Sequence, residues 1–358
     1  MKKTYLMLAL AGMTMIGCSQ SEIMEVGADA QTGRINFASL VNKGTRAIDN
    51  ATFNQFTVFG SYKMPTSEAR ITIFNSQTVT KSGDEWKYAA TDNDLRYWIK
   101  DGIYNFAAYG IDGNTLPTGA NANFLGDRYL NFTGFLCNGA NQKDLVYAVN
   151  EYGPALETGN PVVAMEFKHV LSRISFVFKN SFPQGYQIEI DNFKVVNVRD
   201  KGNFYGSVFE ANGANPWVNP NPTGSEYTTP ERSSGRPEIA LGFTADGASA
   251  ASGASVTTEP AYVIPFAYTE ANVHIEFHLS VVREAADQET TKIFDKTYHA
   301  QLKPEWVMGH QYRYTIDLSG SEIGLEPIKF SGTVGDWSGW EDIDAGKIDT
   351  GNLPQEQL

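Results

Sequence analysis

The sequence predicts an all-β protein of two tandem β-sandwiches, and three observations support this fold class. Hydrophobic and polar residues alternate at period two in several stretches, which is typical of half-buried strands. Aromatic residues make up 12% of the 358 residues, and their side chains pack well on pleated sheets. Glycine occurs 33 times and supplies turns between short strands. No long amphipathic helix is predicted, and residues 140–150 are the best place for a short one.

Three stretches of the N-terminal half predict strands. They are residues 34–46, 53–60, which is followed by a short run at 71–74, and 98–109. In the first stretch Ile35, Phe37 and Val41 share a parity, so the strand can bury one face. In the third stretch Asp101-Gly102 predicts a turn that leads into an aromatic strand.

Four stretches of the C-terminal half predict further strands. They are residues 170–178, 188–198, 273–281 and 328–334. The second changes parity near Asp191, which predicts a β-bulge. In the third the apolar residues point one way, whereas His274, Glu276 and His278 point the other way, toward solvent. A loop at residues 157–161 separates the halves and predicts sandwiches over 47–160 and 161–358.

The N-terminus has the features of a bacterial lipoprotein signal. Lys2 and Lys3 precede a mostly apolar stretch, residues 5–16, which is too short to span a bilayer. The stretch ends in Met-Ile-Gly-Cys, which resembles a lipobox, so residues 1–17 are predicted to be a signal peptide and Cys18 to be lipidated. No other segment reaches membrane-spanning length, so a lipid such as palmitate is expected to provide the attachment.

Charge and cysteine content exclude several classes of protein. The formal net charge is −13, which argues against binding of nucleic acid, because phosphate contacts need clustered lysine and arginine. Apart from Cys18 the chain has one cysteine, Cys137, so no internal disulfide is expected. Cys137 is interpreted as a small buried hydrophobic residue.

The residues show no catalytic or metal-binding pattern. His274 and His278 lie four apart, about 13 Å along a strand, so one zinc ion does not reach both. His169 precedes Ser172, but no carboxylate that would orient the imidazole can be identified. Nucleophile-elbow, phosphate-loop and Cys-x-x-Cys motifs are missing. We therefore expect neither an enzyme nor a cofactor or metal site.

Several motifs in order resemble the fimbrillins of Bacteroidales, the subunits of type V pili. After the lipobox they are residues 43–47 (KGTRA), 56–60 (FTVFG), 98–109 (WIKDGIYNFAAY), 167–176 (FKHVLSRISF), 306–314 (WVMGHQYRY) and 334–337 (VGDW). The resemblance covers nearly the whole chain. It implies that the two sandwiches are transthyretin-like and that the protein reaches the outer membrane and the fimbrium at the cell surface.

The resemblance also implies a route of assembly. A trypsin-like protease would cut between Arg46 and Ala47 and remove the pro-segment, residues 18–46, with its strand. A strand of another pilus subunit would then fill the opened groove, as in β-augmentation, and the pilus would contribute to adhesion. Gly44 and Thr45 before the arginine favour an accessible junction.

The position of the subunit in a pilus stays open at this point. The tail, residues 341–358, spaces its apolar residues by five, which makes it a poor donor strand. This spacing favours a tip or accessory subunit slightly over a stalk subunit. A surface glycan-binding lipoprotein is the second hypothesis. It would use loop aromatics such as Trp217 and Tyr227, although a core or turn role for Trp217 is favoured. A β-sandwich hydrolase is the third.

Overall fold

Strands dominate the parts of the chain that the structure describes. This computed structural model describes residues 33–41, 48, 51–88, 94–124, 129–139, 141–153, 161–207, 215–217, 219–220, 227–228, 230–267, 273–284, 290–302, 304–319, 329–336 and 341–343. Helical structure in these ranges is limited to short turns such as η3 (Asp112–Asn114). The all-β prediction is confirmed. Among the described residues, no helix has the length and apolarity needed to span a membrane.

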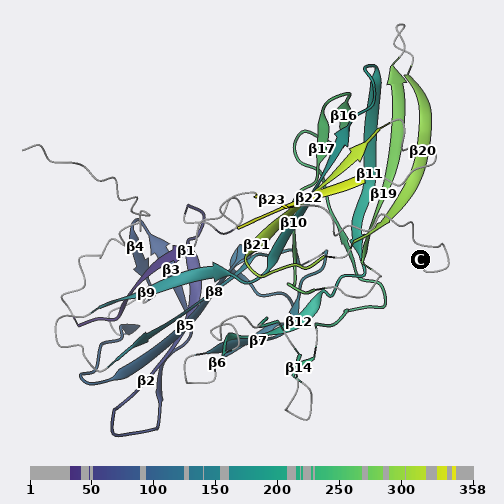
Figure 1. The fold of residues 1–358 in the computed structure, drawn as a ribbon. Helices are drawn as coiled ribbons and strands as arrows, with labels where there is room; N and C mark the ends of the chain where they lie inside the picture. The colour runs from purple at the N-terminus through teal and green to yellow at the C-terminus, as the bar shows by residue number, and fades with distance from the viewer. Residues whose placement is uncertain are drawn as a thin grey trace, which may run out of the picture.

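Seven strands form a closed barrel in the N-terminal half (Figure 1). In barrel order they are β1 (Asn36–Val41), β4 (Glu85–Lys87), β3 (Ile71–Ser82), β2 (Gln55–Lys63), β5 (Ile103–Ile111), β8 (Leu145–Tyr152) and β9 (Val162–His169). The helix suggested for residues 140–150 is wrong, because β8 pairs with β5 from Ile111↔Leu145 to Tyr104↔Tyr152. Its run of β-branched and aromatic residues is better suited to a buried strand.

Aromatic rings fill this barrel. Phe56, Phe74 and Phe106 are almost completely buried and come from three different strands. Gly60 makes room for them, because a Cβ atom at this position would lie 2.9 Å from the ring of Phe106.

The predicted turn before β5 is present. Asp101 has a φ of 62°, and the N–H of Gly102 donates to the carbonyl of Ile99 at 3.1 Å.

Two sheets pack face to face in the C-terminal half (Figure 1), which confirms the sandwich prediction. One has the order β17 (Ser255–Thr257), β10 (Ser172–Asn180), β21 (His310–Leu318), β22 (Lys329–Asp336) and β23 (Glu341–Ile343), with β18 (Ala261–Val263) also paired to β10. The other has the order β15 (Glu238–Ala240), β11 (Tyr186–Val196), β19 (His274–Glu284) and β20 (Thr290–Gln301), with β16 (Ser249–Ala251) also paired to β11. Phe178 of the first sheet and Phe277 of the second meet with ring centroids 4.9 Å apart. The predicted bulge is present between Asp191 and Lys194.

A third core joins the two halves. It lies around a small sheet of β6 (Asn121–Phe124), β7 (Leu130–Leu136) and β12 (Lys201–Tyr205) and includes Tyr147, Leu171 and Trp217. A two-stranded sheet, β13 (Asn219–Pro220) with β14 (Tyr227–Thr228), lies nearby. Strand pairing crosses the predicted boundary at residue 160, because β9 closes the N-terminal barrel and β12 pairs with β7. The division at 160 itself stays a prediction.

Candidate functional site

β1 is the first strand of the described chain and closes the N-terminal barrel (Figure 1). It runs parallel to β9 over six residue pairs, from Asn36↔Val162 to Val41↔Phe167. On its other side, within the described residues, it pairs with β4 at Phe37↔Trp86. One residue upstream, the N–H of Ile35 donates to the carbonyl of Arg96 at 2.8 Å. The chain therefore holds β1 by backbone hydrogen bonds along both edges.

The inner face of β1 is buried in the barrel core. Ile35 is completely buried, and Phe37 and Val41 are nearly so, which confirms the predicted shared face. The ring of Phe37 makes edge-to-face contacts with four other rings. Their centroids lie 5.4 to 6.0 Å away and belong to Phe56, Phe74, Tyr88 and Phe106. Phe37 thus occupies the centre of the aromatic core, although it comes from the first of the described strands.

The chain is anchored again shortly after β1. Ile48 is buried in the same core as Phe37, and its N–H donates to Asp144 Oδ2 at 3.4 Å. Asp144 is itself buried, and its Oδ2 lies 2.9 Å from Nδ1 of His169 on β9. The sites predicted at Cys18, Arg46 and Ala47 lie outside the described residues. Val41 and Ile48, on either side of the predicted cut, are both core residues.

The sequence alone did not identify a carboxylate beside His169, and the structure shows that this carboxylate is Asp144. Asp144 is distant from His169 in sequence, which explains why it was missed. The side chains of His169 and Asp144 are only 3% and 0% exposed. The hydroxyl of Ser172 donates to the carbonyl of Val307 at 2.7 Å. The carboxylate of Asp144 therefore accepts the backbone N–H of Ile48, close behind the predicted cut. The hydroxyl of Ser172 is bonded to Val307.

Cys137 and Trp217 are both core residues. Cys137 is buried, and burial raises the pKa of its thiol well above the usual value. Trp217 is completely buried and donates its indole N–H to the carbonyl of Val170. Trp217 is therefore inaccessible as a platform for stacking sugars, and the side chain of Tyr227 lies outside the described residues.

The prediction that His274 and His278 both face solvent is wrong for His274. The side chain of His274 is 1% exposed, whereas that of His278 is 27% exposed. His278 lies between two carboxylates, 3.2 Å from Asp191 and 3.0 Å from Asp295. The two histidines share one face of β19, as predicted, but side chains of neighbouring strands cover that face at His274.

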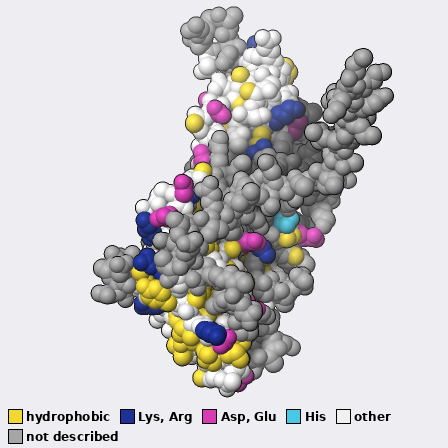
Figure 2. Space-filling view, turned by 90° about the vertical axis from the view of Figure 1, so that its left-hand side faces the viewer, with side chains coloured by type: hydrophobic (Ala, Val, Ile, Leu, Met, Phe, Trp, Pro, Cys, Tyr) yellow, Lys and Arg dark blue, Asp and Glu magenta, His cyan; other side chains and the backbone are white. Residues whose placement is uncertain are grey.

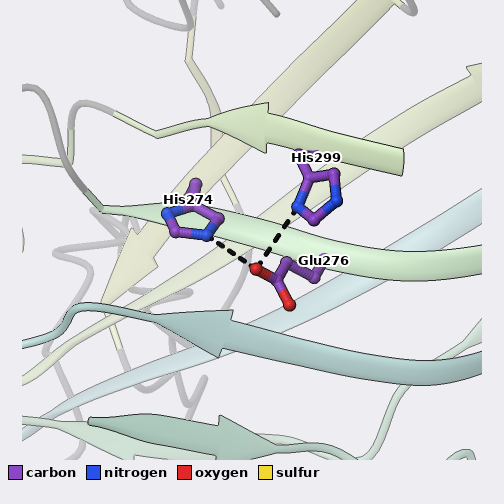
Figure 3. Close-up of side chains that lie close together, drawn as sticks. All are labelled: His274, Glu276 and His299. Atoms are coloured by element: carbon purple, nitrogen blue, oxygen red, sulfur yellow. Dashed lines mark hydrogen bonds and ion pairs between the residues drawn. The ribbon is translucent and has the colours of Figure 1, made fainter. Parts of the chain in front are cut away.

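His274, Glu276 and His299 form a cluster on this face (Figure 3). Glu276 Oε1 lies 3.0 Å from His274 Nε2 and 3.3 Å from His299 Nδ1. Glu276 also bonds to Lys194 on β11, at 3.0 Å, and to Arg236. Burial alone would raise the pKa of Glu276, but the bonds from His274 and Lys194 and the charge of Arg236 lower it to about 2.

The sequence reasoning missed the part that β20 plays in this cluster. The register pairs Glu276 with His299, so the two side chains are cross-strand neighbours on one face. Alternation within one strand identifies which residues share a face, but it does not identify the neighbouring strand or its register. Once β19 and β20 are known to pair with this register, the cluster follows.

Hydrophobic side chains also gather at one end of the N-terminal barrel, the lower end in Figure 2. Ile71 at the start of β3 is 54% exposed, and Ile99 before β5 is 40% exposed. The register places both strand starts at one end, because β2 pairs Tyr62 with Ile71 and Lys63 with Ile103. This end lies next to residues 96–98, which pair with the start of β1.

Comparison with known proteins identifies the family. A sequence model described as fimbrillin-like matches residues 45–337, which is most of the chain. The chain belongs to the fimbrillin-like family. This membership supports a pilus-type or adhesive role at the cell surface, in assembly with other fimbrial subunits. The family is one of structural proteins of fimbriae and adhesion.

Solved structures of fimbrial proteins are similar to this chain. A fimbrial protein from Bacteroides vulgatus superposes with a TM-score of 0.58 at 16% identity, covering 85% of this chain and 99% of that one, and this likeness is one of fold. The fimbrial anchor protein Mfa2 from Porphyromonas gingivalis gives a TM-score of 0.33 at 9% identity, covering 86% of this chain and 99% of that one. No curated protein matches the sequence significantly.

Proposed function

We propose that this fimbrillin-like chain is a pilus subunit that assembles by strand exchange after proteolysis at Arg46. The protease removes the segment that contains β1, and a strand of a neighbouring subunit takes its place in the barrel. The observation that carries the proposal is the position of β1. It is the first strand of the described residues, and it supplies the centre of the core and pairs with β9 along its full length.

Loss of β1 would leave a gap that favours a new strand. Ile35, Phe37 and Val41 would vacate the core, and truncating a single buried phenylalanine already costs about 3–5 kcal/mol. The backbone of β9 would lose its partner over six residues. An unpaired strand edge beside an open hydrophobic groove is a template for another strand.

Cleavage after Arg46 would leave the strands that follow β1 connected to one another. β1 continues into the remainder of the chain only through residues 42–47, so cleavage after Arg46 breaks no other strand connection. Ile48 remains fixed by its burial and by its hydrogen bond to Asp144. The new N-terminus at Ala47 would then start one residue before an anchored position.

The predicted lipid on Cys18 fits the same scheme. The lipid would hold the precursor at the outer membrane, and Cys18 lies in the segment that is removed. Cleavage would therefore release the subunit from its anchor in the same step that opens the groove. Position in the filament stays open between stalk and tip or accessory. The first residues of the tail, 341–343, form β23 and already pair with β22.

The glycan-binding alternative has no specific observation in its favour. The burial of Trp217 removes one of the two aromatic residues on which that alternative depended. We therefore retain strand exchange as the function that the geometry supports best.

Limited proteolysis tests the proposal. We expect an arginine-specific protease to convert folded protein to a core that begins at Ala47 and then forms oligomers. Arg46→Ala should remain uncut and monomeric, whereas Arg70→Ala, which changes an arginine beside β3 of the same barrel, should behave like the wild type. A folded chain that resists cleavage at Arg46, or an Arg46→Ala variant that still assembles in cells, would overturn it.

A further inference from the structure

We propose that His274, Glu276 and His299 form a binding site for a divalent transition metal of the zinc class. The site lies on the outer face of the C-terminal sandwich, away from the barrel that contains β1. It requires only residues that are already close together, and nothing in the strand-exchange proposal uses it.

The distances among the donor atoms suit such a metal. The three ligand atoms lie within 4.8 Å of one another, and the His274–Glu276 and His299–Glu276 distances are 3.0 and 3.3 Å. Two ligands that each lie about 2.0–2.1 Å from a tetrahedral zinc ion are roughly 3.3 Å apart. Figure 3 shows both rings directed at one carboxylate oxygen from adjacent strands.

The donor types favour zinc and its neighbours over calcium or magnesium. Two imidazoles and one carboxylate are the ligands of borderline transition metals, whereas calcium and magnesium prefer oxygen donors. Two histidines and one glutamate fill three positions of a tetrahedron and leave the fourth open for water or another donor. Nδ1 of His299 is buried, and its printed contact is with Glu276 Oε1 at 3.3 Å, which is itself a ligand of the proposed site.

Backbone pairing fixes two of the ligands relative to each other. His299 lies directly opposite Glu276 in the antiparallel register of β19 and β20, and His274 lies two residues before Glu276 on the same face. The side chain of His299 is 28% exposed, so solvent reaches the cluster from the β20 side. A metal ion would enter by this side and link two strands that are already paired.

Arg236 competes with the metal. Its guanidinium bonds to Oε1 of Glu276, the same oxygen that faces both histidines, and also to Glu238 at 2.6 Å. A cation at the cluster must displace this guanidinium, whereas Lys194 binds the other oxygen, Oε2. The arginine is therefore expected to set the affinity. Removing it should tighten metal binding without adding any ligand.

Three variants separate this site from non-specific binding. Purified protein is titrated with Zn²⁺ by calorimetry and with Co²⁺, whose visible absorption reports tetrahedral coordination. We expect one ion per chain and a rise in Tm that EDTA reverses. His299→Ala should weaken binding by about tenfold or more and lose the Co²⁺ bands. Arg236→Ala should bind more tightly than the wild type.

His278→Ala is the matched control, because His278 shares the strand and the face but contacts Asp191 and Asp295 instead of Glu276. It should keep full affinity. Circular dichroism in EDTA checks that each variant is folded. The proposal is overturned if the wild type binds no stoichiometric ion, if His299→Ala binds as well as the wild type, or if Arg236→Ala binds no more tightly.

Discussion

Phe37 shows how one side chain of β1 stabilises the whole barrel. Its ring contacts residues from β2, β3 and β5 as well as Tyr88, so four separate segments pack against it. Edge-to-face pairs of this kind add roughly 0.5–1.5 kcal/mol each beyond the burial of area. The stability of the unprocessed protein therefore depends on a residue that the mature subunit is proposed to lose.

Replacing Phe37 by alanine should lower the free energy of unfolding of the uncut protein by about 3–5 kcal/mol, because it empties the centre of an aromatic core. Urea unfolding followed by tryptophan fluorescence measures this change. Ile71→Ala is the control, since an exposed side chain should change stability by no more than about 0.5 kcal/mol. Filaments assembled from processed subunits should be indifferent to Phe37→Ala. A large effect on their stability would contradict the removal of β1.

At the scale of single elements, alternation within the sequence located most strands correctly. Ile35, Phe37 and Val41 defined the buried face of β1, and the parity change near Asp191 marked the bulge of β11. The pattern failed where burial on both faces removes alternation. In β8, Leu145 to Tyr147 are all buried, and such an apolar run does not distinguish a strand from a helix.

The candidate sites were predictable only to the extent that their residues lie close in sequence. The strand before Arg46 could be found from one stretch of chain. Contacts between distant segments could not be found from a single stretch, because strand order and register are set by the whole sheet. Asp144 with His169, and His299 with Glu276, are such contacts. The error at His274 has the same cause, since side chains from β11 and β20 lie over the face that the alternation assigned to solvent.

β1 as an element should be replaceable by a peptide of the same sequence. A synthetic peptide of residues 34–43 should bind to the processed core and slow its polymerisation, because it restores the pairs with β9 and refills the core. Calorimetry and light scattering measure the two effects. A peptide carrying Phe37→Asp has the same length and backbone but would have to bury a charge. It should neither bind to the processed core nor slow its polymerisation. Equal inhibition by both peptides would show that the groove is not the site of assembly.

For the whole molecule, attachment to the membrane is predicted to depend on Cys18 alone. Changing Cys18 to alanine should abolish incorporation of labelled palmitate and leave the protein soluble in the periplasm or uncleaved. Cys137→Ala is the matched control and should be labelled like the wild type, since Cys137 is buried in the fold. Palmitate labelling that persists in the Cys18→Ala variant would contradict the assignment.

The covalent link between β1 and its own barrel has a consequence for the timing of assembly. In the intact chain β1 is covalently linked to its own barrel, and a linked strand competes at an effective concentration on the order of millimolar. A free strand of another subunit would have to exceed that concentration to displace it. Cutting the tether turns β1 into a separate peptide that dilutes away once it leaves. The backbone bond after Arg46 would therefore keep secreted subunits monomeric until the protease reaches them.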